Sequence, residues 1–426
     1  MKRTSCLLTI AGLACSLTLS TGCDDGSTEA GDESSGETDG DSDLVEVSGD
    51  LTEDTTWTAD KEYVLSDFVF IKGATLTIEP GTTIRGLSGS ALVIEKDAMI
   101  MAEGTADAPI VFTSNEDSPS RGDWGGLVLL GNAVTNIGTG QAEGFPVPPT
   151  YGGDDDSHDC GTLRYVRVEY AGYALSDGNE LNGIGFFACG SGTEVSYVQS
   201  HMGLDDGIEM FGGTFDIDHI VVTGANDDSL DMDQGFRGTA THVFIHQDPA
   251  VGDNCFEISN QSSDFSAEPK TAPMFCNVTC VGSGASGEKS KGLTVKEGTY
   301  ATWQATIVTN TANEATLLND DATADEAAAG NIVIENNIFF GNGNPEHQSE
   351  SMTIPQADWD TWIWDEARAN LMSDPGLASA EWGAPDPTPS GDVSGNGTSC
   401  AEAGYIGAVD PSGDNWTAAS WINYTP

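Results

Sequence analysis

Acidic residues recur at matching positions in successive stretches of the chain. In the segments centred on Ile208, Leu230 and Phe256, a carboxylate directly follows the central apolar residue. Other acidic residues stand just before these segments or two positions farther along. We call the combined set the acidic column: Asp205, Asp206, Glu209, Asp227, Asp228, Asp231, Asp233 and Glu257. Because calcium prefers oxygen ligands, the set predicts a calcium site if the fold stacks these segments.

The acidic column has two other interpretations. Like charges about 5 Å apart cannot all ionise without cost, so a carboxyl that kept its proton would gain acid–base capacity. In an enzyme, Glu209, Asp231 and Asp233 would then be the catalytic acids, with Arg237 as a nearby cation. In the structural interpretation, Asp and Asn simply suit the turns between strands, and Glu209 and Asp231 face water.

The spacing of the segments predicts the elements that position these side chains. Each segment is short, rich in β-branched or aromatic residues and bounded by Gly, Asn or Asp, which is typical of a strand. A second series of such segments, beginning at residues 165–168, runs out of phase with the first. Strands at this period favour a solenoid of stacked parallel strands, and an ordinary β-sandwich is the alternative. The central apolar residues, separated by 24, 22, 26 and 37 positions, are Ile184, Ile208, Leu230, Phe256 and Leu293.

Several motifs together carry a resemblance to a known family. They include LTIEPGTTIRG (76–86), DWGGLVLLGNA (123–133), GTLRYVRVEYAG (161–172), DDGIEMFGGT (205–214) and the ending YIGAVDPSGDNWTAASWINYTP (405–426). This set resembles a family of cell-surface lipoproteins from Bacteroidetes-like and myxobacteria-like organisms. The resemblance implies an all-β chain: a right-handed parallel β-helix with loop insertions over residues 46–342. A loop-rich C-terminal cap and final coil, carrying a short helix, would follow over residues 343–426.

The N-terminus predicts export and a lipid anchor. Met1-Lys2-Arg3 precedes a short apolar stretch, and Gly22 precedes Cys23, so residues 1–22 are typical of a lipoprotein signal peptide. Cys23 is the predicted site of the covalent lipid. Cys15 is the alternative site, and plain secretion without lipid is the alternative process. Residues 23–45 hold acidic, Gly, Ser and Thr residues that cannot form a core, so they predict a disordered tether.

The cysteines predict a disulfide framework in an exported protein. Of nine cysteines, Cys6 and Cys15 belong to the signal peptide and Cys23 to the lipid site. An even number remains, which is typical of three disulfides and leaves the connectivity open. These six are Cys160, Cys189, Cys255, Cys276, Cys280 and Cys400.

Two groups of aromatic residues have a binding and a packing interpretation. Trp359, Trp362 and Trp364 have helical spacing, so they predict either a helix that covers the end of the solenoid or a platform for a sugar. A second group falls at matching positions of the out-of-phase strands and predicts either a glycan-stacking surface or packing under a loop. We call this group the aromatic ladder: Tyr165, Tyr197, His219 and His242.

The charge balance limits the function. The chain of 426 residues has 68 acidic residues against 15 Lys and Arg, a net charge of −53, which excludes nucleic acid as a partner. Membrane contact is expected through the lipid alone, at the outer membrane or cell surface. We therefore expect a non-catalytic binding, adhesion or structural module for a glycan or surface protein, stabilised by calcium. The alternative is a polysaccharide lyase or glycoside hydrolase on the same scaffold.

Overall fold

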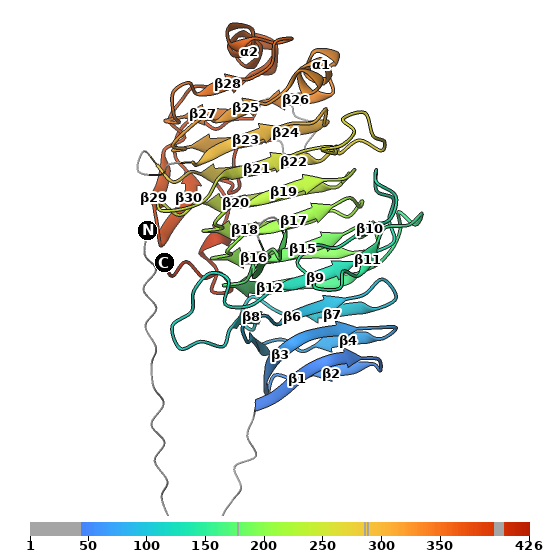
Figure 1. The fold of residues 1–426 in the computed structure, drawn as a ribbon. Coiled ribbons are helices and arrows are strands. Elements are labelled where there is room, and N and C mark those ends of the chain that lie inside the picture. Colours follow the sequence, from blue (N-terminus) through green and yellow to red (C-terminus); the bar gives the residue numbers. More distant parts are fainter. Residues whose placement is uncertain (1–43, 177–178, 285–286, 288, 396–403) are drawn as a thin grey trace, which may run out of the picture. The chain divides into compact units, whose positions relative to one another are not determined.

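The computed structural model describes residues 44–176, 179–284, 287, 289–395 and 404–426. The predicted signal peptide, the lipid site at Cys23, most of the tether and Cys400 lie outside the described residues. No helix in the described part of the chain is long and apolar enough to cross a membrane. The strands wind upward as a stack of coils (Figure 1).

The stack is a parallel β-helix with three faces. Its strands pair in parallel with the strands one coil above and below, in one continuous sheet that turns at the corners. The first face contains β2 (Thr55–Trp57), β4 (Thr75–Ile78), β7 (Met99–Glu103), β12 (Gly161–Glu169), β16 (Glu194–His201), β18 (Ile217–Thr223), β20 (Thr239–His246), β22 (Met274–Val281), β24 (Ala301–Thr309) and β26 (Ile332–Glu335).

The longer strands of the first face bend and continue into the second face. These strands are β12, β16, β18, β20, β22 and β24. The second face also contains β1 (Leu44–Leu51), β3 (Glu62–Ile71), β5 (Thr83–Gly86), β8 (Ile110–Ser114) and β27 (Ile338–Phe340). The third face begins with the last residues of β1 and β3, which also bend from the second face. It then contains β6 (Ala91–Ile94), β9 (Leu127–Leu130), β15 (Ile184–Phe187), β17 (Ile208–Phe211), β19 (Leu230–Asp233), β21 (Asn254–Ile258), β23 (Lys291–Val295), β25 (Thr316–Leu318) and β28 (His347–Ser349).

The predicted apolar column forms the core behind the third face. Ile184 pairs with Ile208, Ile208 with Leu230, Leu230 with Phe256, and Phe256 with Leu293, and all five are buried. The repeat therefore predicted both the stacking and the register of these strands. The solenoid is confirmed, and the β-sandwich alternative is wrong.

The bend between the first and second faces falls at one position in each coil. Tyr165, Tyr197, His219 and His242 occupy it in β12, β16, β18 and β20, each with a φ between 49° and 55°. Left-handed backbone is uncommon for residues other than glycine, and Asn and His are enriched there. The bend stacks these four side chains directly above one another.

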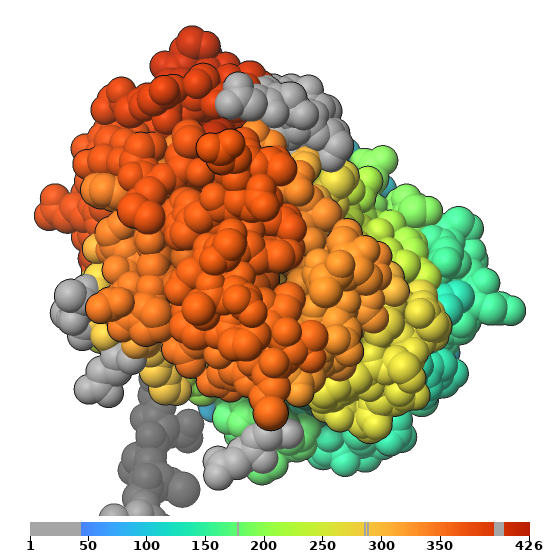
Figure 2. Space-filling model, turned by 90° about the horizontal axis from the view of Figure 1, so that it is seen from above, coloured from blue at the N-terminus to red at the C-terminus, as the bar shows by residue number. Residues whose placement is uncertain are grey.

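Two helices lie at the C-terminal end of the stack, where they cover the last coils (Figures 1 and 2). They are α1 (Asp321–Ala329) and α2 (Gln356–Ile363). Trp359 of α2 is buried, and its indole Nε1 donates to Thr316 Oγ1 at 3.2 Å. Trp362 stacks on Trp359 and carries the Arg368 guanidinium on its ring. These contacts favour the predicted end cover over the sugar platform.

The last residues of the chain run back along the side of the stack. We call residues 405–426 the strap. The side chain of Asn277, on β22, donates to the carbonyl of Tyr405 in the strap. Farther along the strap, the carbonyl of Trp421 accepts from the guanidinium of Arg167, on β12. The strap holds a short 3₁₀ turn (Trp416–Ala418) and no strand that extends the solenoid. The strap instead covers the apolar outer surface of the second face, and the stacked strand within residues 343–426 is β28, which pairs in parallel with β25.

Three small hairpins decorate the coils: β10 (Gly140–Gln141) with β11 (Thr150–Tyr151), β13 (Ala174–Ser176) with β14 (Asn179–Glu180), and β29 (Leu377–Glu381) with β30 (Ala384–Pro389).

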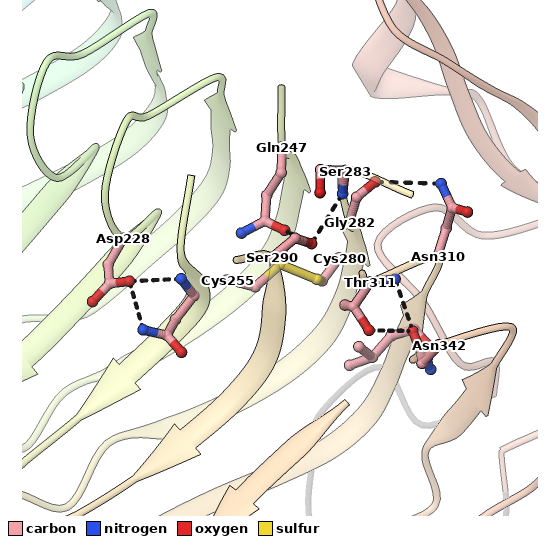
Figure 3. Close-up of a disulfide and its surroundings, with 12 residues drawn as sticks. Asp228, Gln247, Cys255, Cys280, Gly282, Ser283, Ser290, Asn310, Thr311 and Asn342 are labelled. Carbon is pink, nitrogen blue, oxygen red and sulfur yellow. Dashed lines mark hydrogen bonds between the residues drawn. A yellow bond between two sulfur atoms is a disulfide. The ribbon is translucent and has the colours of Figure 1, made fainter. Parts of the chain in front are cut away.

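Disulfides and polar side chains join neighbouring coils. Cys160 bonds to Cys189, and Cys255 bonds to Cys280; Cys276 also takes part in a disulfide. Figure 3 shows the Cys255–Cys280 bond among inter-coil hydrogen bonds, such as Ser290 Oγ to Gln247 Oε1 at 2.6 Å. Two pairings of the expected disulfide framework are thus present among the described residues.

Candidate functional site

The strand register brings the acidic column together on the third face. Glu209 of β17 pairs with Asp231 of β19, which pairs with Glu257 of β21. Asp233 lies two residues beyond Asp231 and pairs with Phe211. The carboxylates predicted to be vertical neighbours are therefore neighbours in space.

Four groups of three carboxylates each have oxygens within 4.8 Å of one another. Seven members of the acidic column contribute to these groups, together with Asp253, which precedes the segment of Phe256. The groups are Asp205, Asp206 and Asp227; Asp206, Glu209 and Asp231; Asp227, Asp228 and Asp253; and Asp228, Asp231 and Glu257. Shared members link the groups into one continuous acidic site across three coils.

Part of the acidic column also fastens one coil to the next. Asp206 Oδ1 accepts from the backbone N–H of Asp228 at 2.9 Å, and Asp228 Oδ1 accepts from that of Asn254 at 2.6 Å. Asn182 begins this series by accepting from the backbone of Asp206. One carboxylate oxygen of Asp206 and one of Asp228 therefore have a structural role, as the interpretation of these residues as turn formers predicted. That interpretation does not account for Glu209, Asp231 or Glu257, which lie within the strands.

An insertion between β9 and β12 covers part of the third face, so Glu209 does not face water. Tyr151 of β11 packs against Phe187 and Phe211, and its hydroxyl donates to Gln234 Oε1 at 2.6 Å. Glu209 keeps 8% of its surface exposed. Asp231 and Asp233, one coil farther on, are partly exposed. The site is thus closed at Glu209 and opens toward the later coils.

Burial and mutual repulsion raise the pKa values of these carboxyls. Burial and the charges of Asp205 and Glu180 raise the pKa of Glu143, in the insertion, to about 7. Burial, followed by repulsion from the negative charge of Asp227, raises the pKa of both Asp205 and Asp228 to about 7. Burial also raises the pKa well above the usual range for Asp206, Glu209, Asp231 and Asp233. Near neutral pH the site either holds protons or needs a cation.

Unpaired oxygens mark the places where a cation would be held. Asp231 Oδ1 and Asp233 Oδ1 are buried and have no hydrogen-bond partner among the described residues. The nearby cations pair with other carboxylates: Lys296 with Glu257, and Lys291 with Asp253 at 3.0 Å. The donor set consists of hard carboxylate oxygens, which fits calcium better than a transition metal.

Arg237 does not supply a free cation to the acidic column. Its Nη2 donates to both carboxylate oxygens of Asp156, at 3.1 and 3.2 Å. The sequence suggested a role beside Glu209 and Asp231, but the turn that carries Arg237 directs it to the insertion. Sequence reasoning also missed Glu143 and Glu180, because they belong to an insertion and a hairpin that lie outside the repeat.

The aromatic ladder lies under the strap. The Tyr165 and Tyr197 rings stack at 4.4 Å, and Trp421 contacts both edge-on. His219 stacks on Tyr197 at 4.4 Å and meets the edge of Trp416 at 4.8 Å. These contacts support the packing interpretation over an open glycan-stacking surface.

Fold and site together define a right-handed parallel β-helix protein with a crowded acidic face. A family model described as a pectate-lyase-like β-helix domain matches residues 49–385. The chain therefore belongs to this family, and the match supports the predicted parallel β-helix. Comparison with curated proteins gave no match, and neither did comparison with solved structures.

Proposed function

We propose that this protein is an exported, lipid-anchored surface module that binds calcium in the acidic column and recognises a glycan or surface partner without catalysis. The observation that carries the proposal is the set of linked groups of three carboxylates, each group with oxygens within 4.8 Å of one another. Calcium between coils would neutralise this charge and bind the unpaired oxygens of Asp231 and Asp233. The N-terminal Gly22-Cys23 junction supports the anchor.

The surroundings of the carboxylates favour binding over catalysis. Glu209 is closed off by the insertion, so a polymer cannot reach the carboxylate that would act as one of a catalytic pair. Arg237 is engaged by Asp156, and Arg167 donates to Glu169 and to the strap. Both arginines are thus used in structural contacts, including Arg237, the cation suggested by the sequence.

One observation keeps a polysaccharide lyase as the second candidate. Lys296 directly follows β23 and pairs with Glu257, which lies beside the partly exposed Asp231 in the strand register. In its neutral amine form, a lysine next to a calcium site could accept a proton from a uronate held by the metal. The membership in the pectate-lyase-like family is compatible with this alternative.

Product analysis on a polysaccharide panel separates the two candidates. The full chain carrying Cys23→Ser, incubated with uronate-containing and neutral polysaccharides in 1 mM calcium, is expected to release neither unsaturated nor reducing ends. A glycan array probed with the same protein should show binding that a calcium chelator reduces. Cleavage that Lys296→Gln and Asp231→Asn abolish, while the exposed Glu116→Gln does not, would establish the lyase instead.

Removal of the proposed lipid site is expected to release the protein from the membrane. Cys23→Ser eliminates the thiol that would be acylated, so the protein should move from the membrane fraction to the soluble exported fraction. Fractionation and immunoblotting measure the change, and Cys15→Ser is the matched control. A Cys23→Ser protein that stays in the membrane fraction would rule out this anchor.

A further inference from the structure

A second cluster of potential ligands lies on the other side of the solenoid, at the bend between the first and second faces. Asp218 and His219 are in β18, and His242 occupies the position of His219 one coil later in β20. His219 Nδ1 lies 2.6 Å from Asp218 Oδ2, and His242 Nδ1 lies 2.8 Å from Asp218 Oδ1. One carboxylate thus meets two imidazole nitrogens from adjacent coils.

The fold holds these three side chains in place. The two imidazoles stack at 4.6 Å, and Tyr197 and Trp416 contact His219 from two further directions. Thr241 Oγ1 donates to Asp218 Oδ1 at 2.6 Å and fixes the orientation of the carboxylate. Rotation of either imidazole away from Asp218 would break the stack, so the cluster is preorganised.

We propose that Asp218, His219 and His242 bind one Zn²⁺ or a similar borderline divalent cation. One ligand atom from each residue lies within 4.8 Å of the other two. Zinc–nitrogen and zinc–oxygen bonds of about 2.0 to 2.2 Å need only a small closing movement from that arrangement. The metal would replace the protons that now join the imidazoles to the carboxylate.

The chemistry of the cluster selects against calcium. Imidazole nitrogens suit zinc, copper and nickel, whereas calcium takes oxygen ligands. Three protein ligands leave a fourth position, and Asp218, with 42% of its side chain exposed, keeps the cluster open to solvent. Water or a donor from a partner would complete the coordination. This site is separate from the acidic column and does not depend on the proposed calcium site.

Zinc titration of calcium-saturated protein tests the proposal. Saturating calcium competes with zinc for the carboxylates of the acidic column, and native mass spectrometry and calorimetry then count the added zinc. We expect one tightly bound zinc per chain in the wild type. We expect that zinc to be lost in the double variant His219→Phe/His242→Phe, and Asp218→Asn should weaken binding by at least about 10-fold.

The aromatic ladder itself provides the controls. Phenylalanine keeps the ring stack without a ligand nitrogen, so the double variant should retain its metal-free melting temperature. Tyr197→Phe alters the neighbouring ring and should leave zinc binding unchanged. Wild-type protein that takes up no zinc, or zinc binding that survives in a folded double variant, would overturn the proposal.

Discussion

At pH 7.5, calcium-saturated protein is expected to melt several degrees above calcium-stripped protein. Ionised carboxylates in the linked groups repel one another, and a cation between coils replaces that repulsion with attraction. A ligand at 100 times its Kd stabilises the folded state by about 2.7 kcal/mol for one site. Thermal melts followed by circular dichroism measure the difference.

The calcium effect is expected to shrink at pH 5. The pKa of Asp205 rises to about 7 in the folded state, from 3.8 for the ordinary side chain, and that of Asp228 rises likewise. Between about pH 4 and 7 the folded state holds protons that the unfolded chain has lost, so metal-free stability falls as pH rises through this range. Calcium must displace these protons at pH 5 but fewer of them at pH 7.5.

Three buried histidines act in the opposite direction, so the calcium difference must be compared at each pH. Burial lowers the pKa of His201 and His246 to about 4 and that of His347 to about 3. They remain neutral in the fold, and stability is lost as pH falls below about 6.5, where the unfolded chain takes up protons. This loss of stability is the same with and without calcium, so it cancels when the melting temperature without calcium is subtracted from that with calcium.

Two substitutions test whether the rise in melting temperature on adding calcium comes from the acidic column. Asp231→Asn removes one of the crowded charges, so it should raise the melting temperature without calcium and reduce the gain on adding calcium. Glu116→Gln removes an exposed charge and should change neither value. Identical melts with and without calcium at pH 7.5 would refute the calcium site.

Trp421→Ala is expected to lower the free energy of unfolding by about 3 to 5 kcal/mol. Trp421 is 1% exposed and packs across the stacked rings of Tyr165 and Tyr197. Its loss leaves a cavity and weakens the hold of the strap on the coils beneath it. Denaturant unfolding measures the change, and limited proteolysis should cut the strap earlier in the variant.

Trp421→Phe is the matched control for the strap. The smaller ring retains part of the contact, so the loss of stability should be clearly below that of Trp421→Ala. An alanine variant within about 1 kcal/mol of the wild type would show that the strap contributes little to the fold.

The repeat in the sequence predicted the third face well because each coil obeys the same local rule. Stacked strands fix the register, so the spacing of Ile208, Leu230 and Phe256 was enough to place Glu209 beside Asp231. The coverage of Glu209 could not be predicted this way. It depends on Tyr151, in an insertion whose path is set by tertiary packing and not by the period.

The strap and the cluster of Asp218, His219 and His242 are two further features that the sequence repeat could not predict in full. Spacing predicted that Tyr165, Tyr197, His219 and His242 stack, but the cover over them comes from residues more than 170 positions later. Asp218 faces the two histidines because the backbone bends beside it, with a φ of 55° at His219. Such a bend leaves no clear signal in a single sequence.

The strap also changes how the molecule would respond to force. A solenoid whose coils touch only their neighbours can peel apart one repeat at a time. Here the strap accepts hydrogen bonds from Asn277 of β22 and from Arg167 of β12, so it connects several coils directly along one side of the stack. Pulling on the two chain ends should therefore produce one large rupture when the strap releases, followed by the smaller steps of successive coils.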